Sequence, residues 1–441
     1  MASAVPVSAF ASRHPVRGRV ARRLLPFLFL LYVTNFVDRA NLAYAGLGMH
    51  HDLGFSERVF GTGAGIFFIG YLALQIPGAL AAERWGARPL IGSIMIIWGG
   101  LTVLTGFVQT PIHLYAARFL LGAAEAAFFP GVIIYLSRWF VYEDRAKAIA
   151  NFMAAIPVSF IIGAPVAGLL LGVHWFGIEG WRWLFLLEGF PAALLGVVTI
   201  FYLPDQPISA AWLNEDERTW LARTLAEEKR IKVAGQSYSA WAALRYRPAI
   251  LLGSVAFFAF SAGYAFDFWF PTILKRFSGL SDLRVSLLGA IPFVAGLIAM
   301  QVNGWHSDLK CEQRWHISMP LLVGALAFLC LLVLPPSLGL MVALFTVVGV
   351  SAHAFLPCLW NFPTLLLSDS AAAAAIGLMN TFGSLGGFVG PYAIGYLYSR
   401  THSFSPGLGC LMLACFVAAS LILFCPVSRL KAGCPSTPDH C

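Results

Sequence analysis

The chain has 441 residues, of which 59% are hydrophobic and only 11% are charged, and its mean hydropathy is +0.76. Soluble globular proteins carry about 25% charged residues, so this composition excludes an ordinary soluble domain. The formal net charge is +8, which in a soluble chain would raise the question of nucleic-acid binding. The positions of the basic residues give a different explanation, as described below.

Apolar runs recur along the whole chain, at the length of about 20 residues that a helix needs to cross a bilayer. The sequence predicts twelve such segments, and therefore an all-α membrane protein. They cover residues 24–47, 59–82, 89–108, 113–136, 146–172, 182–203, 248–272, 284–305, 316–335, 337–359, 371–398 and 407–427.

The basic residues follow the membrane topology that these segments imply. With the N-terminus in the cytoplasm, 21 of the 29 Lys and Arg residues fall on the cytoplasmic side, and six fall on the other. This bias is what the positive-inside rule predicts when both termini are cytoplasmic. The first run carries charges and lacks a signal-peptidase motif, so we expect a retained first helix. The basic charge thus reports topology, and we expect no nucleic-acid partner.

A polar stretch divides the chain into two halves of six segments each. We expect a basic cytoplasmic arm (1–23), a first six-helix bundle (24–203), a linker (204–247), a second bundle (248–427) and a cytoplasmic tail (428–441). Within the linker, Asn214 and Glu217 have the spacing of a capping box. They predict an amphipathic helix that runs to about Arg230 and tethers the two halves.

Two features recur at nearly the same spacing in both halves. Glu83 and Asp308 each follow the second span of their half and are 225 residues apart, while Pro165 and Pro391 are 226 residues apart. A shared spacing indicates an internal repeat, and transporters built from repeats hold their site between them. The short charged loops favour a conformational latch, for which the candidates are Glu83, Arg84, Arg88 and Asp308.

Four charged residues lie within two of the predicted spans: Asp38 and Arg39 in the first, Arg118 and Glu125 in the fourth. A charge at mid-membrane costs about 2.5–3.5 kcal/mol on insertion scales. Buried ion pairs add little to stability on balance, so a functional role is favoured over a structural one. Neighbours on a helix point about 100° apart, so Asp38 and Arg39 cannot both face one cavity. Arg118 and Glu125 share a helix face, about 10.5 Å apart along its axis.

Several sequence blocks resemble the major facilitator superfamily and, within it, the anion:cation symporter family. The loop GALAAERWGAR at 78–88 resembles the superfamily's loop signature, with Glu83 in the place of its Asp. The block RFLLGAAEAAFFPGVIIYLSRWF at 118–140 resembles the family's fourth helix, and WRWLFLLEGFP at 181–191 its sixth. The resemblance spans about residues 20–427. It implies two pseudo-symmetric bundles in the major facilitator fold and transport of organic anions, usually with protons.

These residues divide naturally into anion ligands and proton carriers. A guanidinium binds a carboxylate through two parallel hydrogen bonds, so we expect Arg39 to grip the substrate, aided by Arg118. Glu125 is the expected site of the coupling proton, controlled by movement of Arg118, with Asp38 as a second proton site. The same division is implied by sugar-acid transporters of the resembling family. Further candidates for substrate binding are Tyr71, which matches a family tyrosine, and Gln75, Asn361 and Asn380.

We therefore predict a monomeric transporter of the bacterial inner membrane that imports a small organic anion with protons. A hydroxylated carboxylate such as tartrate or a sugar acid is favoured. Phe36 is a departure from the tyrosine of sugar-acid members, so an aromatic acid of the phthalate or hydroxyphenylacetate type stays open, as does exchange or export.

No nucleophile with a base or phosphate-binding loop indicates an enzyme. The eight cysteines show no metal-ligand spacing, so neither metal nor cofactor is expected apart from the proton. The roles of Asp267, Glu188 and His353 are left open.

Overall fold

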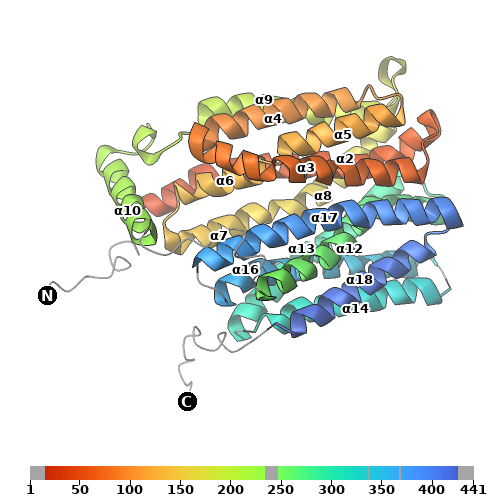
Figure 1. The fold of residues 1–441 in the computed structure, drawn as a ribbon. Coiled ribbons are helices and arrows are strands. Elements are labelled where there is room, and N and C mark those ends of the chain that lie inside the picture. Colours follow the sequence, from red (N-terminus) through yellow and green to blue (C-terminus); the bar gives the residue numbers. More distant parts are fainter. Residues whose placement is uncertain (1–14, 234–246, 311, 336, 367–368, 426–441) are drawn as a thin grey trace.

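The computed structural model describes residues 15–233, 247–310, 312–335, 337–366 and 369–425. Within them the chain is helical, with no strand (Figure 1). The first half contains α2 (Pro15–Leu53), α3 (Glu57–Trp85), α4 (Ala87–Thr105), α5 (Pro111–Glu125), α6 (Phe128–Ser137), α7 (Tyr142–Met153), α8 (Ala155–Leu171) and α9 (Gly180–Tyr202). The second half contains α12 (Arg247–Ser278), α13 (Asp282–Lys310), α14 (Arg314–Val333), α15 (Leu338–Ala354), α16 (Leu356–Leu366), α17 (Asp369–Thr401) and α18 (Ser405–Leu423).

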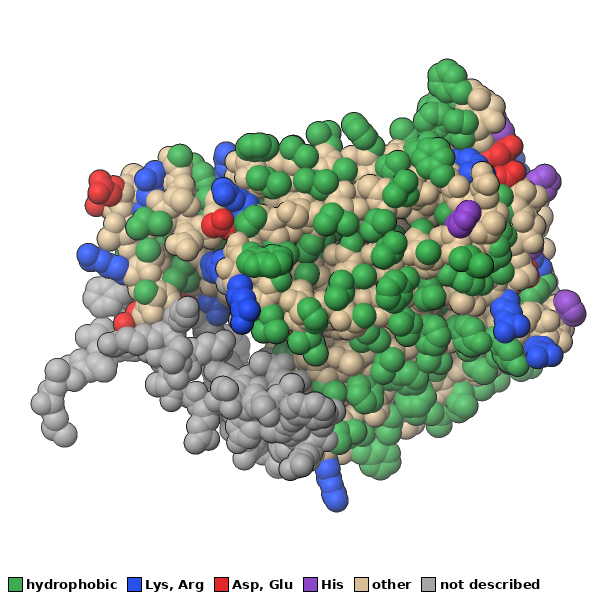
Figure 2. All heavy atoms as spheres, turned by 45° about the horizontal axis from the view of Figure 1, so that its top comes forward, with side chains coloured by type: hydrophobic (Ala, Val, Ile, Leu, Met, Phe, Trp, Pro, Cys, Tyr) green, Lys and Arg blue, Asp and Glu red, His purple; other side chains and the backbone are tan. Residues whose placement is uncertain are grey.

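Eleven segments among the described residues are long and apolar enough to cross a membrane. Ten of the eleven correspond to the predicted segments before 371–398, and the eleventh is α18. The predicted segment 371–398 forms α17, which has 33 residues and packs along α12 and α3. Hydrophobic side chains cover the flank of the molecule, and charged side chains gather at its two ends (Figure 2). This distribution is that of a protein surrounded by lipid.

Three of the predicted spans are each built from two helices. The breaks fall between α5 and α6, α7 and α8, and α15 and α16. Pro130, Pro157 and Pro357 follow these breaks closely. Proline has no N–H to bond the carbonyl four residues earlier, which explains why the helix is interrupted just before it. The first break places Glu125 at the last residue of α5.

The linker helix α10 (Glu215–Val233) forms as predicted. The Asn214 amide donates to Glu217 Oε2 at 3.0 Å, and the Glu217 amide donates to Asn214 Oδ1 at 2.8 Å. The capping box is therefore confirmed. Glu217 also pairs with Arg19 of α2 at 2.7 Å, so α10 is attached to the first half. We call this end of the molecule the α10 end, and the opposite end the far end (Figure 1).

The two halves pack against each other through two similar pairs of helices, α3 on α17 and α8 on α13, and α2 also contacts α12. Glycines allow this approach, because a Cβ on Gly61 would lie 2.7 Å from the Pro391 carbonyl oxygen, and one on Gly168 would lie 2.6 Å from Ser286 Cβ. All four residues lie in the far half of their helices. The packing is therefore tight toward the far end.

Ion pairs reinforce this closure at the far end. Arg276 of α12 pairs with Glu57 at the start of α3 and donates to the Tyr398 hydroxyl. His50 of α2 lies 3.1 Å from Glu57 and 2.9 Å from Arg276. We call His50, Glu57 and Arg276 the far gate. It joins the first half to the second through three helices.

Candidate functional site

A cavity lies between the two halves, near the middle of the helices. It has two connected parts of about 50 and 100 Å³, which share Phe36, Arg39, Phe68, Tyr264 and Asp267 in their walls. The smaller part reaches Arg118, and the larger part reaches Tyr71 and Asn380. Phe, Tyr and Trp residues make up more than a third of the wall. Of the predicted substrate ligands, the structure thus brings Arg39, Arg118, Tyr71 and Asn380 to one cavity.

Arg39 is held by a carboxylate of the same half. Its Nε donates to Glu125 Oε2 at 2.9 Å, and the Asn35 side-chain amide donates to the same oxygen at 2.8 Å. Glu125 is completely buried. The Arg39 guanidinium also lies 5.2 Å from the ring centre of Tyr71 and 4.9 Å from that of Phe36. The ion-pair partner of Glu125 is therefore Arg39, whereas we expected Arg118 to control this carboxylate.

Arg118 is buried, with 3% of its surface exposed, and its guanidinium lies over the Phe67 ring at 5.0 Å. Its Nε and Nη1 atoms have no hydrogen-bond partner among the described residues. A buried guanidinium without acceptors is costly, and an anion in the adjacent cavity would supply them. This arrangement differs from the expected one, in which Arg39 is the principal anion ligand.

Asp38 faces away from the cavity, as the helical geometry predicts. Its Oδ2 accepts a hydrogen bond of 2.6 Å from Trp98 Nε1 of α4, and the residue is fully buried. Glu188 of α9 lies near Asp38 and Asn41. Unpartnered polar atoms gather here: Asp38 Oδ1, both side-chain atoms of Asn41, Thr102 Oγ1 and Glu188 Oε2. A buried polar layer thus lies behind the cavity, inside the first bundle.

The remaining predicted ligands lie elsewhere. Gln75 is half-buried on α3 and Asn361 is exposed on α16, and neither lines the two parts of the cavity. His353 does line it, and its Nδ1 lies 2.9 Å from the Gly349 carbonyl oxygen.

The predicted latch residues are only partly arranged as a cluster. Arg88 pairs with Asp205, just after α9, with Nε to Oδ2 at 3.4 Å. The Arg88 amide also donates to Asp205 Oδ1 at 3.1 Å. Arg84 and Asp308 are exposed, and the Glu83 side chain lies outside what the structure describes. The described part of the loop is therefore anchored to the exit of the sixth span.

Sequence reasoning missed several parts of the site. Tyr264 was not singled out, although Phe260, Tyr264 and Asp267 follow one another at helical spacing and all line the cavity. The far gate was also missed, although Glu57 and Arg276 are charges that stand just beside apolar runs. The helical spacing in the first case, and the charges at the ends of the predicted spans in the second, were the signals that could have identified these residues.

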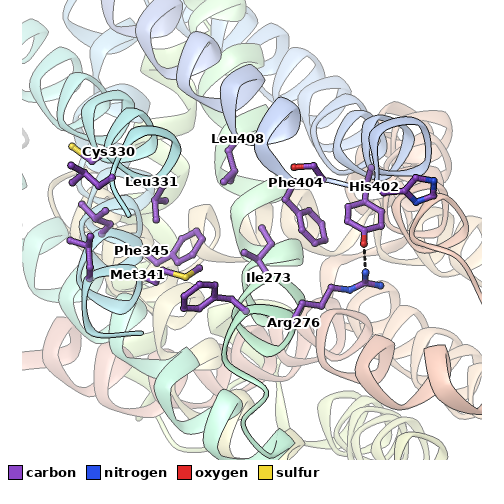
Figure 3. Close-up of a pocket in the computed structure, with 15 residues that line it drawn as sticks. Ile273, Arg276, Cys330, Leu331, Met341, Phe345, His402, Phe404 and Leu408 are labelled. Atoms are coloured by element: carbon purple, nitrogen blue, oxygen red, sulfur yellow. Dashed lines mark hydrogen bonds between the residues drawn. The ribbon is translucent and has the colours of Figure 1, made fainter. Parts of the chain in front are cut away.

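A second, larger cavity of about 340 Å³ lies within the second half at the far end (Figure 3). Its wall is largely apolar, with Met341, Phe345 and Leu408 among its residues. Arg276 points from it toward the Tyr398 hydroxyl. This cavity belongs to one bundle and does not reach the buried arginines of the central site.

A helical fold of two paired bundles, with eleven described helical segments able to span a membrane and a charged central cavity, defines a membrane transporter. Residues 28–391 match the Major Facilitator Superfamily, and the chain belongs to this family. It is a multi-pass protein of the bacterial inner membrane, of a transporter family and not an enzyme family.

Curated relatives match nearly the whole chain. One from Agrobacterium vitis, named "Putative tartrate transporter", is 44% identical over 416 residues, which cover 94% of this chain and 95% of the relative. The inner membrane transport protein RhmT of Escherichia coli is 35% identical, over 91% of this chain and 93% of the relative. The quinolone resistance transporter of Acinetobacter baumannii is 33% identical, over 93% of this chain and 95% of the relative.

Solved structures confirm the fold. The inward-facing, unoccupied crystal structure of a bacterial homologue of the human lysosomal transporter Spinster superposes with a TM-score of 0.73. It is 19% identical and covers 96% of this chain and 98% of that one. At this identity the likeness concerns the fold alone.

Proposed function

We propose that this protein imports a small organic carboxylate, of the hydroxylated kind such as tartrate or a sugar acid, together with protons. The observation that carries the proposal is Arg118, a buried guanidinium with free donors at the wall of a cavity between the two halves. The name of the Agrobacterium relatives refers to tartrate, which supports this substrate class.

The Arg39–Glu125 pair supplies a physical link between proton and substrate. While Glu125 is ionised, it holds one donor of Arg39 at 2.9 Å. Once Glu125 is protonated, it no longer holds a charge against Arg39, and this guanidinium becomes available to an anion. Arg39 and Arg118 then provide two forks, which suit the two carboxylates of a tartrate-like acid. Asp38, behind the cavity, is proposed as a second proton carrier.

Alternating access would follow from the contacts between the halves. We propose that the far end faces the outside, in keeping with the positive-inside bias, so that this structure is closed to the outside by the far gate and the α3–α17 and α8–α13 contacts. Release of those contacts would open the cavity outward. Protons and substrate would then enter together.

Transport in proteoliposomes tests the proposal. Reconstituted protein should accumulate labelled tartrate under an inward proton gradient and should show counterflow without one. Counterflow without any response to the gradient would identify an exchanger. Absence of both with tartrate, sugar acids and aromatic acids alike would contradict carboxylate transport.

A further inference from the structure

Asp267 of α12 is the only carboxylate that the second half contributes to the described wall of the central cavity. It belongs to both parts of the cavity, and in the smaller part it lines the same space as Arg118 of the first half. Its Oδ1 atom is buried and has no hydrogen-bond partner among the described residues. The far gate and the Arg39–Glu125 pair do not involve it.

A carboxyl group in the wall of an anion site opposes the anion unless it meets a hydrogen-bond donor. The nearby Tyr44 hydroxyl does not supply one in this structure, since Tyr44 Oη is also buried without a partner among the described residues. The other neighbours in the smaller part are largely aromatic, including Phe160, Phe268 and Phe68. An unpaired buried acceptor is costly, so the missing donor is expected on the transported molecule.

We propose that Asp267 is a specificity residue that accepts hydrogen bonds from hydroxyl groups of the substrate while Arg118 binds its carboxylate. The substrate class is then a hydroxy acid, with hydroxyls carried on carbons next to the bound carboxylate, and plain dicarboxylic acids of the same length are rejected. This inference rests on the proposed function and adds its selectivity. The two sides of the cavity then have different roles: the first half binds the carboxylate of the substrate, and the second half hydrogen-bonds its hydroxyl groups.

Tartrate and succinate form a matched pair, because they share the four-carbon dicarboxylate skeleton and differ only in two hydroxyl groups. A site that hydrogen-bonds a hydroxyl rejects the analogue that lacks it, since its own polar group is left unpaired. Binding to the purified full-length protein in detergent should therefore favour tartrate over succinate by roughly tenfold to a hundredfold. Aspartate, which carries an ammonium group instead, serves as the third ligand.

Two variants separate recognition from folding. Asp267→Leu removes the acceptor and should bring the tartrate-to-succinate affinity ratio close to one, mainly through weaker tartrate binding. Asp267→Asn keeps a carbonyl oxygen and should restore part of the preference. Gly100→Ala, on α4 away from the cavity wall and where a Cβ would meet nothing within 4 Å, is the control and should leave the ratio unchanged.

The outcomes distinguish this inference from the proposed function. Equal binding of tartrate and succinate by the wild type, or a ratio that Asp267→Leu does not change, overturns the role of Asp267 while carboxylate binding stands. If aspartate binds more strongly than tartrate and this preference is lost in Asp267→Leu, Asp267 binds an ammonium group, and its assignment to substrate hydroxyls is overturned. No binding of any carboxylate would contradict the proposed function itself.

Discussion

At the scale of single residues, the two buried arginines differ in what already surrounds them. Arg39 has a carboxylate partner at 2.9 Å, whereas Nε and Nη1 of Arg118 have none among the described residues. The substrate therefore meets Arg118 first in our account, and Arg39 joins when Glu125 releases it. The sequence predicted that both arginines lie in membrane spans. It did not show which of them would lie beside Glu125, because that depends on how the helices pack.

Arg118→Lys tests the anion site. Lysine keeps the charge but loses the planar fork that matches a carboxylate, so we expect tartrate affinity to fall by roughly tenfold or more. Titration calorimetry on the purified protein measures it. Arg400→Lys, at an exposed residue of the far end, should bind as the wild type does. Unchanged affinity in Arg118→Lys would remove this residue from the site.

Glu125→Gln tests the coupling site. The variant cannot ionise, so Arg39 stays available to the substrate and counterflow should persist. Accumulation driven by a proton gradient should be lost, because no proton is bound and released there. Concentrative uptake at the wild-type level in proteoliposomes would contradict the role of Glu125. Glu179→Gln, at a surface carboxylate before α9, is the matched control.

At the scale of helices, closure depends on glycines at the α3–α17 contact. Gly61 leaves no room for a side chain, since its Cβ would lie 2.7 Å from the Pro391 carbonyl. The α5, α7 and α15 segments each end close before a proline, and these interruptions were not predicted because the apolar pattern continues through them. A hydropathy pattern reports burial in lipid and does not show where a helix is interrupted.

Gly61→Ala should therefore hinder closure at the far end and favour the state open to that side. A cysteine at Ala64, which lines the cavity, reports this state in a cysteine-free background. Its labelling by a membrane-impermeant thiol reagent added from the far side should become several-fold faster in Gly61→Ala. Gly100→Ala, where a Cβ would meet nothing within 4 Å, should not change the rate. Slower labelling in Gly61→Ala would contradict the assignment of the closed side.

At the scale of the whole molecule, much was predictable. Eleven of the twelve predicted spans, the helical class and the capped linker helix follow from periodicity and local hydrogen-bond rules, which act over short stretches of chain. Other features depend on contacts between helices that are distant in sequence. These are the pairing of Glu125 with Arg39 in place of Arg118, the far gate, and the position of Asp267. Those contacts are decided by packing, and one sequence does not reveal them.

The most direct test of the account is the number of protons bound with the substrate. Tartrate binding measured by calorimetry, in buffers of different ionisation enthalpy, gives this number for the purified protein. Because release of Arg39 requires protonation of Glu125, we expect about one proton to be taken up per tartrate bound by the wild type and none by Glu125→Gln. Tartrate binding without proton uptake, or equal uptake by Glu125→Gln, would contradict the central claim.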